Sequence, residues 1–241
     1  MHNPNAKLSP QLYARTAGFL YLLVIILGGF AYGYVPGRLV SASVVTTGSA
    51  ILTHETLWRI GVVAALLVVV CGIPQLLCEY LLLRPVQRNL ALLAVFFNLI
   101  SLTIESLSNI GFIGALFILK GRDSLSAVNP HQLQAWASLA IELHDQAVNI
   151  SFLFFGCVCL LYGYLIFKSG FLPRFLGILM AVAGVCYAAN SLITFMAIHL
   201  GPAGFPWLLL PAGLCELVLC LWLLIAGVNA AKWLERAGLA A

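Results

Sequence analysis

Long runs of hydrophobic residues, separated by short polar connectors, dominate the pattern along this chain. Each run is close to or longer than the roughly 20 residues that cross a bilayer as an α-helix. The six runs are residues 16–35, 60–83, 90–119, 147–167, 175–198 and 207–231. None of them shows the alternation of period two that is typical of a transmembrane β-strand, and the backbone inside lipid must satisfy its own hydrogen bonds. The pattern therefore predicts an all-α polytopic membrane protein, a bundle of six transmembrane helices.

Two connecting segments carry additional structure. Residues 39–52 are uncharged but too short for a span and rich in Ser, Thr and Gly, which predicts an interfacial segment. Residues 131–146 follow the helix-start signal Asn129-Pro130 and place Trp136 and Leu143 on one face. This second pattern predicts a short amphipathic lead-in helix before the fourth span.

Composition excludes an ordinary soluble domain. Hydrophobic residues make up 62% of the 241 residues and charged residues only 8%, against about 25% charged in soluble domains. The net charge of +4 comes from basic residues that are spread singly, without the Lys/Arg cluster that nucleic-acid or anionic-lipid binding would need. We therefore expect membrane lipids as surroundings and no nucleic-acid partner. The seven cysteines all lie inside apolar runs without a C-x-x-C spacing, so we predict small buried side chains and neither a metal site nor a cofactor.

The distribution of Lys and Arg at the ends of the runs predicts the orientation. With the N-terminus inside, the inner side holds Lys7, Arg15, Arg84, Arg88, Lys168, Arg174, Lys232 and Arg236, and the outer side holds Arg38, Arg59, Lys120 and Arg122. Eight basic residues against four favour the cytoplasm for both termini. Residues 1–15 are then a cytoplasmic N-terminal segment, which we expect to stay attached, and residues 232–241 a cytoplasmic tail.

Three glutamates lie inside the predicted spans: Glu79, Glu105 and Glu216. An ionisable residue inside a span costs about 2.5–3.5 kcal/mol on insertion scales, so each of them is a functional candidate. Around Glu105, polar residues recur at steps of three or four and line one stripe of the third span: Asn98, Ser101, Ser108 and Asn109. This stripe must face protein or water rather than lipid.

A rise of 1.5 Å per residue places most of these polar groups in the outer half of the membrane. We therefore predict one outward-facing polar pocket for a small or lipid-like molecule. Its candidate catalytic residues are Glu105, Glu216, His144 and Asp145, and its candidate substrate-pocket residues are Arg59, Asn109, Asn149, Tyr187 and Asn190. Glu79 is expected on the inner side.

The sequence leaves three functional classes open. An enzyme would use a protonated Glu105 or Glu216 as general acid and the neighbours His144 and Asp145 as the base pair. A proton-coupled transporter would use Glu79, Glu105 and Glu216 as proton carriers. In a structural or regulatory subunit, these carboxyls would matter only for stability, and the Asn, Ser and Thr side chains would serve as interhelical hydrogen bonds. The oligomeric state stays open as well.

Four groups of short motifs carry a resemblance to a known family. They are Ala14-Arg15-Thr16-Ala17-Gly18 with Tyr21-Leu22; the stretch from Leu83-Arg84-Pro85 to Leu93; Phe155-Gly156 through Gly163-Tyr164-Leu165, with Ser169-Gly170, Leu172-Pro173-Arg174 and Leu176-Gly177; and Glu216 with Leu221-Trp222-Leu223-Leu224 and Gly227-Val228. With these motifs the chain resembles, from about Arg15 to Val228, the bacterial membrane-protein family catalogued as domain of unknown function 4386. The resemblance implies a multi-helix protein of the bacterial inner membrane. It implies no activity, cofactor or site residues.

Overall fold

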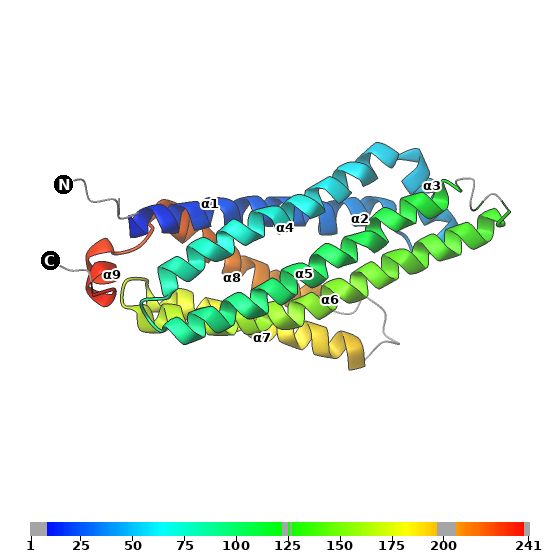
Figure 1. The fold of residues 1–241 in the computed structure, drawn as a ribbon. Coiled ribbons are helices and arrows are strands. Elements are labelled where there is room, and N and C mark those ends of the chain that lie inside the picture. The colour runs from blue at the N-terminus through cyan, green and yellow to red at the C-terminus, as the bar shows by residue number, and fades with distance from the viewer. Residues whose placement is uncertain (1–8, 122–124, 126, 197–205, 239–241) are drawn as a thin grey trace. The chain divides into compact units, whose positions relative to one another are not determined.

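The computed structural model describes residues 9–121, 125, 127–196 and 206–238. The described part consists of helices joined by short connectors (Figure 1): α1 (Pro10–Gly28), the π-helical turn η1 (Gly29–Tyr34), α2 (Val35–Leu39), α3 (Val44–Thr53), α4 (Glu55–Leu83), α5 (Arg88–Leu119), α6 (Pro130–Ser169), α7 (Arg174–Met196), α8 (Pro206–Ile225) and α9 (Ala230–Arg236). Six of its helical segments are long and apolar enough to cross a membrane: Pro10–Leu39, Glu55–Leu83, Arg88–Leu119, Pro130–Ser169, Arg174–Met196 and Trp207–Ile225. The predicted all-α polytopic membrane fold is confirmed.

The helix predicted as a lead-in to the fourth span is present, and it continues into that span without a break. Residues 131–146 and the span 147–167 form one continuous helix of 40 residues, α6. The physical reason is local, because neither Gly nor Pro occurs between Pro130 and Gly156 to end the helix. The other segment that we singled out, residues 39–52, forms most of the short helix α3. Ser43 caps the start of this helix, because its side chain accepts a hydrogen bond from the Thr46 amide.

Several span boundaries also differ from the prediction, and the largest differences are in the first and last spans. The first helical segment begins at Pro10, not at residue 16, and continues through η1 and α2 to Leu39. The last long helix ends at Ile225 instead of residue 231, because Gly227 adopts a left-handed φ of 67° and Asn229 then caps α9. Some predicted positions lie outside the described residues: 1–8, 197–198 and 239–241 of the predicted segments, and Arg122 of the charge count.

By its contacts the chain forms two compact units. The first unit comprises the described residues of 1–22, 71–101 and 152–241, and the second comprises residues 23–70 and 102–151. Each unit is described by itself below.

The first unit is built on close contacts between helices that carry glycine. On α6 and α7, Gly163 faces Gly177 and Gly156 faces Gly184, so closely that a Cβ atom added to Gly177 would lie 2.6 Å from the Gly163 carbonyl oxygen. Gly18 of α1 is equally close to the backbone of α8, and the Cys220 thiol donates a hydrogen bond of 3.3 Å to its carbonyl. Small residues at such positions let membrane helices approach closely, where dispersion contacts take the place of the hydrophobic effect.

The second unit has an aromatic core. Trp58 is fully buried, stacks at a tilt on Phe112 with 4.2 Å between ring centroids, and donates its indole N–H to the Phe112 carbonyl at 3.0 Å. Val35, Leu39 and Ile51 belong to the same buried cluster. The indole therefore loses no hydrogen bond on burial, and its large apolar surface holds α4 against α5.

Candidate functional site

The first unit holds Glu216 at a junction of four helices. The Glu216 Oε2 atom of α8 accepts a hydrogen bond of 3.0 Å from the Tyr187 hydroxyl of α7. The Tyr21 hydroxyl of α1 lies beside the same carboxyl, and the Cys159 thiol of α6 is 4.0 Å from Oε1. All four side chains are buried. Helices α1, α6, α7 and α8 thus each direct one polar group to the same point.

Glu79 of α4 forms a second polar group in this unit. Its Oε1 atom accepts a hydrogen bond of 2.9 Å from Gln75, one helical turn earlier. The Tyr162 hydroxyl lies between the Glu79 carboxyl and the Asn98 amide, near enough to interact with both although its geometry makes no regular hydrogen bond. Glu79 is also close enough to Glu216 for the two carboxyls to interact electrostatically. Glu79 therefore belongs with Glu216.

Neither of these two carboxyls forms an ion pair with a cation in the described part of the chain. The ion pairs among the described residues join Glu55 to Arg59 and to Lys120. Burial of a carboxylate in a low-dielectric interior disfavours its charged form, and the electrostatic interaction with the second carboxyl acts in the same direction. The pair can therefore hold a proton, and tyrosine hydroxyls that donate and accept lie in contact with both members.

The second unit gathers Glu105 with another tyrosine. The partly buried Glu105 lies beside the Tyr32 hydroxyl, and the Asn109 side chain is next to the same hydroxyl. Tyr32 belongs to the π-helical turn η1. Such turns are rare in proteins overall, and many of those that occur lie at functional sites. Ser108 and Asn109 both donate side-chain hydrogen bonds to the Glu105 carbonyl, at 2.7 and 3.1 Å. The polar stripe predicted on this helix is thus partly satisfied by its own backbone.

His144 lies in the same unit and is held in a fixed orientation. Its Nδ1 atom is 2.9 Å from the Ser108 carbonyl oxygen, which can only accept, so Nδ1 carries a hydrogen. The ring stacks on Phe112 at 4.8 Å and lies 5.8 Å from the Tyr32 ring. The orienting bond that we expected from Asp145 is therefore supplied by Ser108. Asp145 instead lies near Glu142.

The remaining predicted residues are distributed over both units. Arg59 is exposed and forms an ion pair with Glu55 through its Nε atom at 2.6 Å. Asn149 donates to the Asp145 carbonyl of its own helix at 3.0 Å. Asn190 is buried in the first unit, and its carbonyl accepts from Thr194. Glu216, Tyr187 and Asn190 belong to one unit and the other predicted site residues to the other, so their convergence on one pocket stays a prediction.

Sequence reasoning predicted Tyr187 and missed three other tyrosines. Tyr21, Tyr32 and Tyr162 each lie inside an apolar run and contact one of the three glutamates. A buried tyrosine needs a hydrogen-bond partner, and this requirement is the signal that would have pointed to them. The described residues contain no group of three His, Cys, Asp or Glu side chains that could hold a metal ion.

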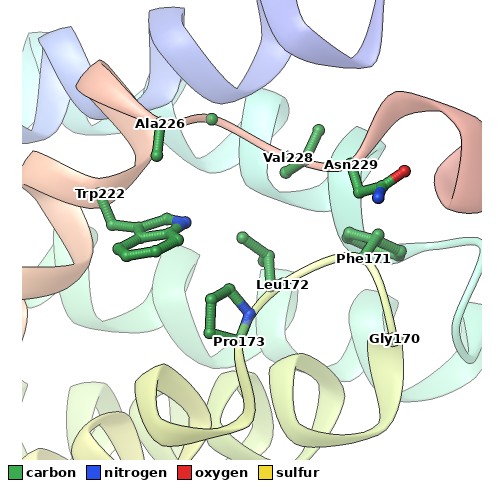
Figure 2. A pocket seen from close by; sticks show the side chains of 9 residues that line it. Gly170, Phe171, Leu172, Pro173, Trp222, Ala226, Val228 and Asn229 are labelled. Atoms are coloured by element: carbon green, nitrogen blue, oxygen red, sulfur yellow. The ribbon is translucent and has the colours of Figure 1, made fainter.

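Two cavities lie at one end of the first unit, away from both glutamates. The first, of about 370 Å³, is lined by the turn between α6 and α7 and by the segment that follows α8. Figure 2 shows Trp222, Leu172, Pro173 and Val228 around it. The second, of about 390 Å³, is lined by Ser169, Gly170, Lys232, Glu235 and Arg236. Gly170 lines both.

Comparison with known proteins gives two matches. The family model described as Domain of unknown function (DUF4386) matches residues 16–227. An "Uncharacterized protein" of Archaeoglobus fulgidus is 26% identical over 168 residues, which cover 69% of this chain and 83% of that protein. No solved structure matches the chain significantly.

Proposed function

We propose that this chain, which belongs to the family described as Domain of unknown function (DUF4386), binds and releases a proton at Glu79 and Glu216 while it handles a small or lipid-like molecule. One observation carries the proposal. Two buried carboxyls lie within electrostatic reach of each other, and the hydroxyls of Tyr21, Tyr162 and Tyr187 lie beside them. Among the described residues, neither carboxyl forms an ion pair with a cation. We further propose that the protein lies in a bacterial inner membrane with both termini in the cytoplasm.

The depths of the two carboxyls support proton-coupled transport, the class that needs Glu79. Glu79 lies four residues before the end of α4, and Glu216 lies nine residues before the end of α8. Those helix ends lie at the same end of the unit, because Trp233 of α9 bonds the Leu82 carbonyl at 2.8 Å. At 1.5 Å per residue, Glu79 is about 6 Å and Glu216 about 14 Å from that end. The pair thus offers two proton-binding groups at successive depths.

The proton itself is measurable by infrared titration of the purified protein. A protonated carboxyl in an apolar site gives a carbonyl stretch separate from that of water-exposed acids, and Glu216→Gln keeps the shape while removing the proton. We expect this band to shrink in Glu216→Gln and in Glu79→Gln. Glu142→Gln, at an exposed site, is the matched control and should leave the band unchanged. If all three variants keep the wild-type band, the buried pair does not hold the proton.

The molecule that is handled can be identified by extracting the protein in polymer nanodiscs directly from its membrane. Mass spectrometry of the co-purified small molecules and lipids, compared between wild type and Glu216→Gln, should show a species that the variant has lost. Reconstituted into vesicles containing a pH-sensitive dye, the wild type should couple movement of that species to proton movement. Identical co-purified molecules and identical dye traces for both proteins would instead support the structural-subunit class.

A second candidate, acid/base catalysis in the second unit, rests on a different observation. There the imidazole of His144 is oriented by the Ser108 carbonyl, and Tyr32 lies against both His144 and Glu105. Such an arrangement suits a general base and a general acid on either side of one hydroxyl. If the protein converts a component of a total lipid extract, Glu105→Gln and His144→Gln should abolish the conversion while Glu216→Gln retains it. The opposite pattern would assign the chemistry to the first unit.

A further inference from the structure

Folding gathers basic residues that are far apart in the sequence at one end of the first unit. Seven exposed cations lie at the start of α1, at the end of α4, at the start of α5, at the end of α6, at the start of α7 and on α9: Arg15, Arg84, Arg88, Lys168, Arg174, Lys232 and Arg236. Glu235 is the exposed acidic residue among the described residues of this unit. The sequence, in which these charges stand singly, gave the opposite expectation about anionic lipids.

Three hydrogen bonds between distant segments hold these helix ends together. Gln11 of α1 donates to the Ala226 carbonyl at 3.2 Å and accepts from the Val228 amide at 3.0 Å, which joins the start of α1 to the end of α8. The Asn229 amide donates to the Phe171 carbonyl in the α6–α7 turn at 3.1 Å. With Trp233 bonded to α4, the basic residues are attached to one fixed surface.

The two cavities at this surface differ in chemistry. The first has the apolar side chains Trp222, Leu172, Pro173 and Val228 around it (Figure 2). The second is lined by Lys232 and Arg236, which lie one turn apart on α9, together with Glu235. Gly170 borders both cavities, so the apolar one and the cationic one are neighbours.

We infer that these adjoining cavities form a binding site for an anionic phospholipid, with the headgroup phosphate between Lys232 and Arg236 and the glycerol and first acyl carbons against Trp222 and Leu172. This inference is independent of the proton-binding pair. An aromatic and aliphatic cavity beside two cations complements a molecule that has an acyl chain next to a phosphate, and a free phosphate would leave the apolar cavity empty. The site lies where apolar helices end, which is the depth of lipid headgroups, and the excess of cations along that end favours an anionic membrane surface.

Native mass spectrometry of the detergent-purified protein, titrated with dioleoyl-phosphatidylglycerol, measures this site. Dioleoyl-phosphatidylcholine has the same chains and no net charge, and it should bind at least tenfold more weakly. The double variant Lys232→Ala/Arg236→Ala should bind phosphatidylglycerol about 25-fold more weakly, at roughly fivefold for each basic residue near the surface. Ala226→Phe, which fills the apolar cavity from an exposed position, should weaken phosphatidylglycerol binding while leaving every charge in place.

The matched control is Arg84→Ala/Arg88→Ala, which removes the same charge from the same end but lines neither cavity. This double variant should lose less than threefold in affinity. Equal losses for the two double variants would mean diffuse attraction and would overturn the site, as would equal binding of the two lipids. Displacement of the lipid by millimolar inorganic phosphate would identify a simple anion site and would overturn the lipid assignment. Thermal melting of each variant checks that it is folded.

Discussion

The glycine contacts between α6 and α7 predict that Gly177→Ala destabilises the protein. An added Cβ atom would lie 2.6 Å from the Gly163 carbonyl oxygen and 2.7 Å from the Phe167 amide nitrogen. Both are backbone atoms, so no side chain can rotate away, and the helices must separate by about 0.8 Å to reach an ordinary contact of 3.4 Å. Overpacking of this kind costs about 1–3 kcal/mol, and the gain in helix propensity from Gly to Ala returns about 1 kcal/mol.

We therefore expect a net loss of about 1–2 kcal/mol, taking the upper part of that range because the clash involves backbone. For a chain of this size, such a loss lowers Tm by roughly 2–8 °C. The assay is the temperature at which half of the detergent-purified protein still elutes as a monodisperse peak after heating. Gly213→Ala is the matched control, because no heavy atom lies within 4 Å of its added Cβ, and its Tm should stay the same or rise.

The double variant Gly163→Ala/Gly177→Ala sharpens the experiment. The two glycines face each other, so one widening of the helix pair accommodates both methyl groups, and the double variant should lose less than the sum of the single losses. Gly18→Ala, in the α1–α8 contact, should instead add fully to Gly177→Ala. A Gly177→Ala protein as stable as Gly213→Ala would refute the close-contact argument.

Three further predictions concern single bonds and topology. A periplasm-active reporter fused after Ala241 should be silent, because the basic residues favour a cytoplasmic C-terminus; strong activity would contradict the orientation. Trp233→Phe removes the bond to the buried Leu82 carbonyl and should cost about 1–3 kcal/mol in thermal melting, whereas Trp136→Phe, at an exposed position, should be neutral. Tyr187→Phe takes the hydroxyl donor from Glu216 and should lower Tm, while the exposed Tyr164→Phe should not; equal melting of the two would show that the bond is unimportant.

The class of fold followed from the sequence because apolar runs of span length have few alternatives. Local sequence signals predicted the ends of the helices less well. The sequence showed Asn129-Pro130 as a helix start but no residue that would end that helix before the fourth span, and the two predicted pieces are one helix. The sequence did not distinguish Gly227 from other glycines of membrane helices. Its φ of 67° explains why α8 ends at Ile225, two residues before Gly227.

The sequence predicted the three carboxyls and Tyr187 as candidate residues, and it did not predict Tyr21, Tyr32 or Tyr162 beside them. Burial cost singles out Glu79, Glu105 and Glu216 from the sequence alone, since charge in a span is expensive wherever it lies. The side chains that contact each carboxyl are determined by the packing of helices that are far apart in the sequence. Depths counted along each helix separately do not predict these contacts. Glu79 was therefore assigned apart from Glu216, whereas the fold brings their carboxyls within electrostatic reach.

The position of Glu216 on the last long helix has a consequence for biosynthesis. Helices enter the membrane in chain order, so Tyr21, Glu79, Cys159 and Tyr187 are already present when α8 leaves the ribosome. The α6–α7 pair, whose facing glycines are 28 residues apart at most, can close before then. The hydroxyl and thiol groups that contact Glu216 are therefore synthesised before it. In a circularly permuted chain that begins with α8, the carboxyl would enter the lipid before these partners are made.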